Sequence, residues 1–340
     1  MNSFSISIAM CSYNGAQFIK DQLGSLASQK RMPDEMVICD DGSNDATVEA
    51  IEKFLPKAPF PTRLIVNKKN RGVTSNYEQA MALCKGDVIA FADQDNIWHP
   101  EKLQRFATAF EQRPMLGSLF SDASVIDADG RPSGYTLWQS IRFNKKEREM
   151  VRSGRALDVL MKYNIASGAT MAFNARLYKK LLLPIPKGCL GDHWMAVICS
   201  AIGELGMIEE PLIQYRKHEG QHVGPKGNGS LFELVAGEMR KWPAVGKYLT
   251  ALREGRLKEI DDALVLYGSA YRRLKKSGLL YSRPEIADQF EEKIAHLETR
   301  KKMAESGRIR RIRPALAELA GLRYHRYSNG IAYPIEDLLA

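Results

Sequence analysis

Short apolar runs alternate with amphipathic segments over roughly the first hundred residues of the chain. Four of these runs are rich in β-branched residues and bounded by polar or glycine-containing turns, which predicts strands. They are residues 5–10, 35–40, 63–67 and 87–93. Between them, apolar positions repeat at helical spacing over 16–29, 45–55 and 74–84. This alternation predicts an α/β fold with a mostly parallel sheet flanked by helices, in which ligands bind at the carboxyl ends of the strands.

Beyond Pro100 the pattern is mixed. It predicts a helix to about Arg113 and another from about Asp192. Further strands are expected at 117–127, 170–174 and 211–216. After a glycine-rich break at 224–230 the pattern is helical. Its expected interruptions are Gly255, Ser282–Pro284 and Ser306–Gly307. We therefore expect an α/β domain over residues 1–225 and a helical region over residues 226–340.

The net charge of +9 over 340 residues lies mostly in the helical region. Residues 226–340 hold 22 basic and 15 acidic residues, a net of +7, which leaves +2 for the rest of the chain. Within them, Arg300–Arg313 carries seven basic residues and one acidic residue, and Leu316, Leu319 and Leu322 follow at helical spacing. This pattern suits an anionic membrane surface or a nucleic acid. A solvated helix face, or a leucine stripe that packs as core or in a homo-oligomer, gives the same pattern.

The cysteines and the apolar runs bear on the cellular compartment. The five cysteines are widely spaced and form no CxxC pair, so the sequence indicates neither a disulfide framework nor a zinc site. The first apolar stretch has no basic leader, and no later run is long enough to span a bilayer without a charge. We expect a cytoplasmic protein that is peripheral on the inner face of the plasma membrane if its basic region binds lipid.

Polar residues follow the first two predicted strands. Cys11 and Tyr13 lie in a turn where an aromatic ring could sit beside a bound ligand, although a plain turn has the same composition. The second strand ends at Asp40, and Asp41 follows it and precedes a glycine. One of two adjacent carboxylates at the end of a parallel strand can accept a hydrogen bond from a ligand N–H, such as the imide of a pyrimidine.

The fourth predicted strand ends in a second acidic pair. Alternation along a strand would send Asp93 and Asp95 to the same side, one pleat apart. Two carboxylates placed in this way can share Mg²⁺ or Mn²⁺ and leave coordination positions open for diphosphate oxygens. The alternative is an Asp-rich loop that only caps the helix after Pro100, which would explain one of the two residues.

Two further residues are candidates that also have structural alternatives. Asp192 precedes an apolar helix, where an aspartate is either an N-cap or, in an enzyme, a base. His218 follows the last predicted strand, and a lone histidine in such a place is more often structural or exposed than a ligand. The residues alone leave both alternatives open.

Taken in order, these motifs resemble those of the family 2 glycosyltransferases, which have the GT-A fold. They are most similar to the bacterial DQDD-type enzymes, many of which are rhamnosyltransferases. The matching blocks are spread over nearly the whole chain, and they read SISIAMCSYNG, ICDDGSNDAT, NRGVTSNYEQAM, KGDVIAFADQDNIWHPEKL, SGATMAFN, GDHWMAV, PLIQYRKHEGQHVG and RYHRYSNGIAYPIEDLL. Two positions depart from that subgroup. Asn96 replaces a second aspartate, and Gly191–Trp194 reads GDHW where HDWW is more usual.

The resemblance implies a role for each candidate residue. Cys11, Tyr13 and Asp41 would line the nucleotide base, and Asn70 and Asp93 would complete the nucleotide-sugar site. The implied ligands of Mg²⁺ or Mn²⁺ are Asp93, Asp95 and His218. The implied catalytic base is Asp192, and the implied acceptor-side residues are Trp98, His193 and Trp194.

The resemblance also implies an activity. The expected reaction is an inverting, metal-dependent transfer of a sugar from a dTDP- or UDP-linked donor to a lipid-linked oligosaccharide of a bacterial surface polysaccharide, such as O-antigen or capsule. Rhamnose from dTDP-rhamnose is the first expectation, and a hexose from a UDP-sugar is the alternative. A non-catalytic nucleic-acid-binding protein is the alternative from another class, but only the charge favours it, because no recognised nucleic-acid motif is present.

Overall fold

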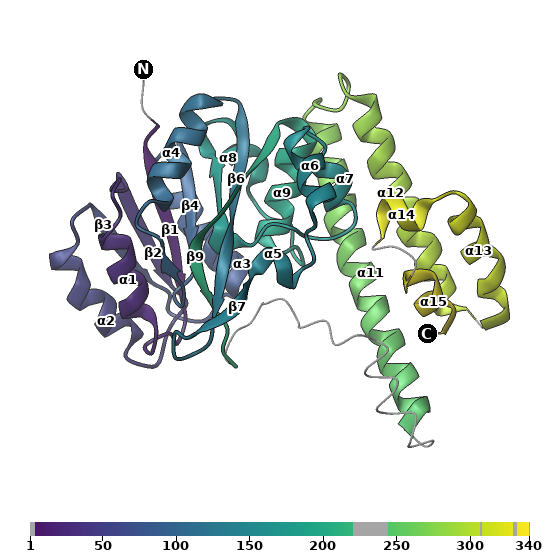
Figure 1. Ribbon diagram of the computed structural model, residues 1–340, viewed down its shortest axis with the longest axis horizontal. Coiled ribbons are helices and arrows are strands. Elements are labelled where there is room, and N and C mark those ends of the chain that lie inside the picture. Colours follow the sequence, from purple (N-terminus) through teal and green to yellow (C-terminus); the bar gives the residue numbers. More distant parts are fainter. Residues whose placement is uncertain (1–3, 220–243, 307, 329–331, 340) are drawn as a thin grey trace. The chain divides into compact units, whose positions relative to one another are not determined.

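The computed structural model describes residues 4–219, 244–306, 308–328 and 332–339, and the chain folds into two compact units (Figure 1). The first unit contains the described residues of Met1–Ala156, Asn164–Ile185 and Leu190–Gly224. The second contains the described residues of Leu157–Tyr163, Pro186–Cys189 and Pro225–Ala340. The predicted boundary between residues 225 and 226 lies outside the described residues. The sequence did not predict that two short segments from the expected α/β domain, Leu157–Tyr163 and Pro186–Cys189, belong to the second unit.

The first unit begins with the predicted alternation of strands and helices. Its first strands are β1 (Ile6–Ser12), β2 (Glu35–Asp40), β3 (Thr62–Val66) and β4 (Val88–Ala92). The helices between them are α1 (Ile19–Ala27), α2 (Thr47–Phe54), the short η1 (Leu55–Lys57) and α3 (Val73–Leu83). These strands pair in parallel in the order β3-β2-β1-β4, which confirms the predicted parallel sheet. However, β4 ends at Ala92, so Asp93 and Asp95 lie in the turn beyond the strand and not on one face of it.

The rest of the first unit extends the sheet in mixed directions. The added strands are β5 (Ile97–Trp98), β6 (Leu116–Ile126), β7 (Pro132–Thr136), β8 (Met171–Asn174) and β9 (Glu204–Arg216). The full order is β3-β2-β1-β4-β8-β6-β9-β5, with β7 paired to β6. Strand β8 is antiparallel to β4 and β6, whereas β9 is parallel to β6 and antiparallel to β5. The sheet is therefore parallel in its first half and mixed beyond.

Further helices cover this sheet. They are α4 (Lys102–Gln112), α5 (Leu137–Ser140), α6 (Lys145–Arg152), η2 (Gly168–Thr170), α8 (Ala175–Leu182) and α9 (Gly191–Ile202). A short helix, α7 (Ala156–Leu160), runs from the first unit into the second. The predicted helices after Pro100 and near Asp192 are confirmed as α4 and α9.

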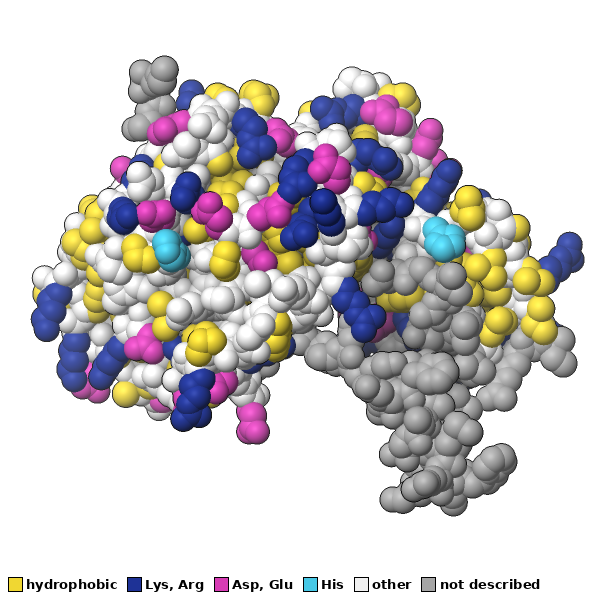
Figure 2. All heavy atoms as spheres, viewed as in Figure 1, with side chains coloured by type: hydrophobic (Ala, Val, Ile, Leu, Met, Phe, Trp, Pro, Cys, Tyr) yellow, Lys and Arg dark blue, Asp and Glu magenta, His cyan; other side chains and the backbone are white. Residues whose placement is uncertain are grey.

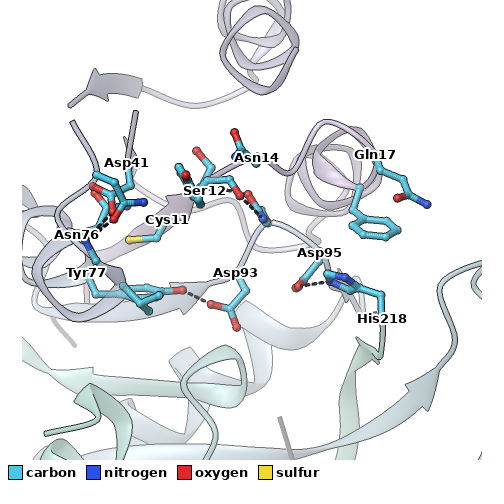
Figure 3. A pocket seen from close by; sticks show the side chains of 16 residues that line it. Cys11, Ser12, Asn14, Gln17, Asp41, Asn76, Tyr77, Asp93, Asp95 and His218 are labelled. Carbon is cyan, nitrogen blue, oxygen red and sulfur yellow. Dashed lines mark hydrogen bonds and ion pairs between the residues drawn. The ribbon is translucent and has the colours of Figure 1, made fainter. Parts of the chain in front are cut away.

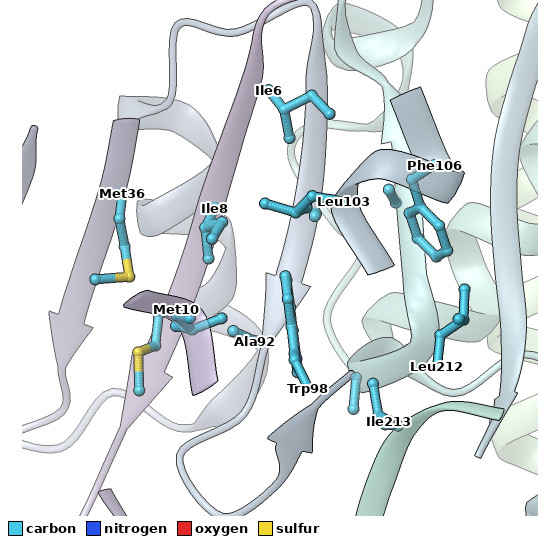
Figure 4. Packing of buried hydrophobic residues seen from close by; sticks show 14 of the residues in the cluster. Ile6, Ile8, Met10, Met36, Ala92, Trp98, Leu103, Phe106, Leu212 and Ile213 are labelled. Atoms are coloured by element: carbon cyan, nitrogen blue, oxygen red, sulfur yellow. The ribbon is translucent and has the colours of Figure 1, made fainter. Parts of the chain in front are cut away.

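The sheet and its helices enclose the main hydrophobic core (Figure 4). Ile6, Ile8 and Met10 alternate along β1 and are at most 1% exposed, because every second side chain of a strand points to the same face. Trp98 of β5 and Leu103 of α4 belong to the same cluster. The core therefore fixes β1 and the start of α4, and the residues that follow β1 and β4 are held at one edge of the sheet.

The second unit is helical. Its longer elements are α11 (Ala244–Lys276), α12 (Pro284–Glu305), α13 (Arg308–Ala320), α14 (Arg323–Tyr327) and α15 (Ala332–Leu339). The expected break before Pro284 is confirmed. Proline suits the first position of α12, because a backbone N–H at that position would have no acceptor within the helix. The expected break at Gly255 is wrong, because α11 continues through it; one interior glycine costs only about 1 kcal/mol relative to alanine. Among the described residues, no helix combines the length and the apolar character that a bilayer crossing needs.

Candidate active site

A pocket of about 530 Å³ opens at the carboxyl ends of β1, β2 and β4 (Figure 3). The predicted nucleotide-sugar and metal positions all line it, namely Cys11, Tyr13, Asp41, Asn70, Asp93, Asp95 and His218. Phe18, Tyr77 and Gln94 also line the pocket, and the sequence pattern gave no sign of this. The parallel strands thus bring the predicted residues to one cavity, as expected for this sheet type.

The Asp41 carboxylate organises the loop that precedes α3. Its Oδ1 accepts hydrogen bonds from the Arg71 N–H at 2.9 Å and from Asn67 Nδ2 at 3.1 Å. Its Oδ2 accepts from the Gly72 N–H at 2.8 Å. Gly72 has a φ of 87°, a conformation that a residue with a Cβ adopts only with strain. A carboxylate has about four acceptor sites, so Asp41 can still accept from a ligand N–H.

The adjacent Asp40 has a different role. Its side chain is fully buried and accepts from the Ser12 hydroxyl and the Ser43 hydroxyl, each at 2.7 Å, and from the Ser43 N–H at 2.8 Å. These bonds fasten the turn after β2 to the end of β1. Of the two neighbouring carboxylates, Asp41 lines the pocket and Asp40 supports the turn.

Asp93 is held by Tyr77 of α3. The Tyr77 hydroxyl bonds to Asp93 Oδ1 and lies 2.9 Å from the Ala92 carbonyl oxygen. Burial, followed by the charge of Asp95, raises the pKa of Asp93 to about 7. A bound cation would lower this pKa again, because a nearby positive charge favours the ionised carboxylate. The hydrogen bond from the Tyr77 hydroxyl fixes the orientation of the Asp93 side chain.

Gln94 ties the turn of residues 93–96, which we call the acidic turn, to the loop after β1. Its Nε2 donates to the Tyr13 carbonyl at 3.0 Å, and its Oε1 accepts from the Tyr13 N–H at 2.8 Å. Gly15 lies against this side chain, since a Cβ at Gly15 would be 2.2 Å from Gln94 Cδ. Gln94, between Asp93 and Asp95, thus pairs with both the N–H and the carbonyl of Tyr13, and its side chain leaves room only for a glycine at position 15.

We expect Gln94→Ala to raise the KM for the donor about tenfold with a smaller effect on kcat, because two hydrogen bonds worth about 1 kcal/mol each no longer hold the two loops together. Steady-state kinetics measures both constants. Gln104→Ala makes the same change on the exposed side of α4 and should alter neither constant. Indistinguishable kinetics for the two variants would show that the Gln94 bonds do not shape the donor site.

Asp95 and His218 lie together at the other end of the pocket from Asp41 (Figure 3). His218 Nε2 is 3.0 Å from Asp95 Oδ2, and the Phe18 ring packs against the imidazole with a centroid distance of 4.6 Å. Asp95 is 8% exposed, and its Oδ1 has no hydrogen-bond partner among the described residues. Burial raises the pKa of this carboxyl group.

These features bear on the predicted metal site. A buried carboxylate oxygen without a partner is costly unless a donor or a cation binds it, and carboxylate oxygen with imidazole nitrogen suits Mn²⁺. Asp95 and His218 therefore fit a divalent cation. Asp93 instead points to Tyr77, so Asp93 and Asp95 do not converge on one point (Figure 3). In the part of the chain that the structure describes, no three carboxylate, histidine or cysteine side chains meet as a complete metal centre.

Arg216 holds the turn of Asp95 from within the protein. Its guanidinium donates to the Asp95 carbonyl at 2.9 Å, to the Ala128 carbonyl at 3.0 Å and to Asp21 Oδ2 at 3.1 Å. Its backbone N–H donates to Asn96 Oδ1 at 3.1 Å. Strand β5, which follows the turn, also pairs with β9, which ends at Arg216. Asn96, which departs from the DQDD pattern, therefore ties the turn to β9.

Asp192 lies in the first turn of α9. The N-cap residue of this helix is Leu190, so an N-cap role for Asp192 is wrong. Instead, Asp192 Oδ2 accepts from the Gly168 N–H at 3.1 Å, and Oδ1 lies 3.4 Å from Asn164 Nδ2. Its carboxylate is half-buried and is not among the side chains that line the pocket.

The electrostatics of Asp192 suit a base near the acidic turn. Burial raises the pKa of Asp192, although its hydrogen bonds oppose that shift. The pKa of Asp93, which burial and Asp95 raise most, is raised further by Asp192. The two carboxylates are therefore within electrostatic reach of each other. A raised pKa makes a carboxylate a stronger proton acceptor, which general base catalysis uses.

Two of the predicted acceptor-side residues belong to the core. Trp98 is 2% exposed and Trp194 is fully buried, with its Nε1 donating to the Leu182 carbonyl at 2.9 Å. Lys102 Nζ lies over the Trp98 ring, 3.6 Å from its centroid. Neither indole ring can therefore contact an acceptor as predicted. His193 is half-buried and keeps an accessible surface.

Lys102 is a buried lysine that links α4 to the turn beside Asp192. It is fully buried, its Nζ donates to the Ala169 carbonyl at 2.7 Å, and burial lowers its pKa. Ala169 lies in η2, whose Gly168 N–H binds Asp192. The sequence signal for this role is a lysine on the apolar side of an amphipathic helix, next to Leu103.

Comparison with known proteins identifies the family. The family model described as glycosyl transferase family 2 matches residues 7–175, which run from β1 through the acidic turn to the end of β8. The chain belongs to this family. The rhamnosyltransferase subgroup stays a prediction.

Curated relatives of this family 2 member are distant. An uncharacterized glycosyltransferase of Nostoc sp. is 24% identical over 216 residues, which cover 63% of this chain and 65% of the relative. WfgD of Escherichia coli, a UDP-Glc:alpha-D-GlcNAc-diphosphoundecaprenol beta-1,3-glucosyltransferase, is 26% identical over 145 residues, or 43% of this chain and 56% of WfgD. The chain thus spans less than two thirds of the length of either relative.

Solved structures share the fold of the family 2 member. The structure of S. aureus TarS 1–349 in complex with UDP-GlcNAc superposes with a TM-score of 0.52 at 16% identity, covering 95% of this chain and 89% of TarS 1–349. Mannosyltransferase PcManGT from Pyrobaculum calidifontis, in complex with GDP-Man and Mn²⁺, gives 0.51 at 17% identity, covering 99% and 86%. The predicted GT-A fold with a C-terminal helical region is confirmed.

Proposed function

We propose that this family 2 member transfers a sugar from a nucleoside diphosphate to an acceptor hydroxyl, with inversion at the anomeric carbon. The observation that carries the proposal is that the two ends of the pocket carry different chemical groups. Asp41 lies at one end, and the Asp95–His218 pair lies at the other (Figure 3). A nucleotide base suits the first end, because Asp41 can accept from its N–H, and a diphosphate with its counter-ion suits the second.

The proposed base site uses the loops after β1 and β2. Asp41 would accept from the imide N–H of a pyrimidine, and Cys11 and Tyr13 would line the ring. The loop of Asn70, which Asp41 holds through the Gly72 N–H, lines the same pocket. Because three backbone or side-chain donors already orient Asp41, its carboxylate is preorganised for this contact.

Mg²⁺ or Mn²⁺ is the cofactor that we propose for the second end. Asp95 and His218 would hold it, and Asp93 lies in the same turn with its orientation set by Tyr77. When bound, such an ion stabilises the negative charge of the departing nucleoside diphosphate. The presence of Mn²⁺ with GDP-Man in the PcManGT structure supports this choice.

Asp192 is the proposed catalytic base. Its carboxylate would take the proton of the acceptor hydroxyl while that oxygen forms a bond to the anomeric carbon. The bond between the anomeric carbon and the diphosphate oxygen breaks, and its electron pair leaves with the nucleoside diphosphate. His193, next to this base, is the remaining acceptor-side candidate.

We propose rhamnose from dTDP-rhamnose as the donated sugar, with a hexose from a UDP-sugar as the alternative. The names of WfgD and of the TarS complex contain UDP, which supports a pyrimidine nucleotide of either kind. The diphosphoundecaprenol in the name of WfgD supports a lipid-linked oligosaccharide acceptor. Such an acceptor would place the enzyme at the cytoplasmic face of the plasma membrane, in the assembly of a surface polysaccharide.

A donor panel tests this proposal. We expect the full chain, with Mn²⁺ and a bacterial lipid extract as acceptor, to release nucleoside diphosphate fastest from dTDP-rhamnose. The panel also contains UDP-glucose, UDP-GlcNAc and GDP-mannose, and reactions without lipid extract correct for hydrolysis. Faster release from a UDP-hexose would select the alternative donor. Acceptor-dependent release from none of the four would contradict the proposed function.

A further inference from the structure

Helix α13 buries two of its charged residues and exposes two of its large apolar residues. Arg311 and Glu318 are each 3% exposed, whereas Ile312 is 50% and Leu316 is 60% exposed. An ordinary helix on a protein surface has the opposite arrangement, with its apolar stripe against the core. The orientation of α13 therefore leaves apolar area in contact with water.

The inward charges explain why α13 keeps this orientation. Arg311 donates to the Ser306 carbonyl at 2.9 Å through one terminal nitrogen and at 3.0 Å through Nε. Glu318 bonds to His296 Nδ1 of α12 at 2.5 Å and accepts from Arg323 at 2.8 Å. A rotation that buried the apolar face would expose or break these bonds, and an unpaired buried charge is strongly destabilising.

The outward apolar surface continues beyond the helix. Leu322, just after α13, is 55% exposed and has a φ of 56°, a conformation that is strained for a leucine. Ala317 and Ala320 are exposed on the same helix. Figure 2 shows apolar side chains gathered over α13 and α14, at the right of the view. We call Ile312, Leu316 and Leu322, together with the exposed arginines Arg310 and Arg313 of the same helix, the α13 face.

The exposed charges of α13 itself are of one sign. Residues 308–328 contain six arginines and one acidic residue, Glu318, which is buried. Arg310 and Arg313 are exposed on α13, whereas Arg326 of α14 is exposed but paired with Glu292 of α12 at 3.7 Å. Two copies of such a surface would repel each other, whereas an anionic lipid surface is its electrostatic complement.

We propose that the α13 face docks the protein on an anionic lipid bilayer, with the three apolar side chains inserted between headgroups and the arginines among the phosphates. A bilayer surface accepts isolated apolar side chains flanked by cations, which is how interfacial helices bind. The inference goes beyond the proposed function and uses none of the pocket residues. It also corrects the expectation for Arg300–Arg313, because Arg300 and Arg311 are buried and only the exposed arginines can reach lipid.

Vesicle flotation of the full chain tests the proposal without any substrate, so its outcome is independent of sugar transfer. At low salt the protein should float with phosphatidylcholine vesicles that contain phosphatidylglycerol, and not with phosphatidylcholine alone. Ile312→Ser with Leu316→Ser and Leu322→Asn should lower the bound fraction about tenfold or more. Arg310→Gln with Arg313→Gln should have an effect of the same size. Asparagine is chosen at position 322 because it tolerates a positive φ.

Matched controls make the same kinds of change elsewhere. Met115→Ser with Leu177→Ser removes exposed apolar side chains from the first unit, and Lys145→Gln with Lys146→Gln removes exposed cations there. Both pairs should float like the wild type, and all variants should keep its melting temperature. Flotation that the α13 variants do not change, or no flotation of the wild type, would overturn the proposal. A wild-type dimer in sedimentation that the apolar variant dissociates would assign the face to a second copy and also overturn it.

Discussion

Asp192→Asn is expected to lower kcat by about 10² to 10⁴, the usual contribution of a positioned general base. Asparagine has nearly the same shape and keeps an oxygen that can accept from the Gly168 N–H, but its amide does not take a proton at neutral pH. The fold and the affinity for the nucleotide donor should therefore be retained. Turnover with saturating donor and acceptor, and donor binding by calorimetry, measure the two quantities separately.

The pH profile gives this prediction a second readout. The base must be ionised to act, so turnover should fall as the pH drops through the pKa of Asp192. Because burial raises that pKa, the loss should begin at a higher pH than for an ordinary aspartate. Asp129→Asn, a matched change at an exposed turn, should preserve both rate and profile. A near-native rate for the Asp192→Asn variant would require another base. A large fall in the melting temperature of this variant would mean that Asp192 mainly holds the Gly168 turn.

Asp95→Asn is expected to lower activity by at least about a hundredfold, because a catalytic divalent ion contributes several kcal/mol of charge stabilisation. The variant removes the charge of Asp95 but keeps the size of its side chain. Its binding of dTDP in the presence of Mn²⁺ should fall to the level that the wild type shows with a chelator. Calorimetric titration of dTDP in both conditions checks this without relying on turnover.

The control for Asp95 separates a metal role from a structural one. Asn96→Asp adds a carboxylate next to Asp95 and can still accept from the Arg216 N–H, so it should keep Mn²⁺-dependent binding of dTDP. If Asp95→Asn bound dTDP like the wild type, and with the same dependence on Mn²⁺, Asp95 would not be a metal ligand. In that case its bond to His218 would serve only to join the turn to the segment that follows β9.

The sequence predicts the first half of the sheet well because its signals are local. Strands β1 to β4 are short apolar runs, and an amphipathic helix separates each from the next, so their parallel direction follows from the alternation alone. The two-residue β5 and the exposed β7 carry no such periodicity. The break predicted at Gly255 fails because one unfavourable residue does not interrupt a long helix.

The candidate site was predictable where its residues end a strand, and less so where distant segments meet. Asp41 and Asp95 were identified from their own motifs. Arg216 and His218 reach the acidic turn only because β9 pairs with β6 and β5, a tertiary pairing that no local pattern reveals. Gln94 was missed because a polar residue between two aspartates has no periodic signature. Trp194 was misplaced because an aromatic residue in a motif gives no sign of whether it is exposed or buried.

The central claim is that the pocket binds a nucleoside diphosphate with its base at Asp41 and its diphosphate at Asp95 and His218. A crystal structure of the full chain with dTDP and Mn²⁺ tests it most directly. The account predicts the thymine imide N–H within hydrogen-bonding distance of the Asp41 carboxylate, and a metal ion that joins Asp95 to the diphosphate. A nucleotide bound in the reverse direction, with its base against His218, or one bound outside this pocket would contradict the account.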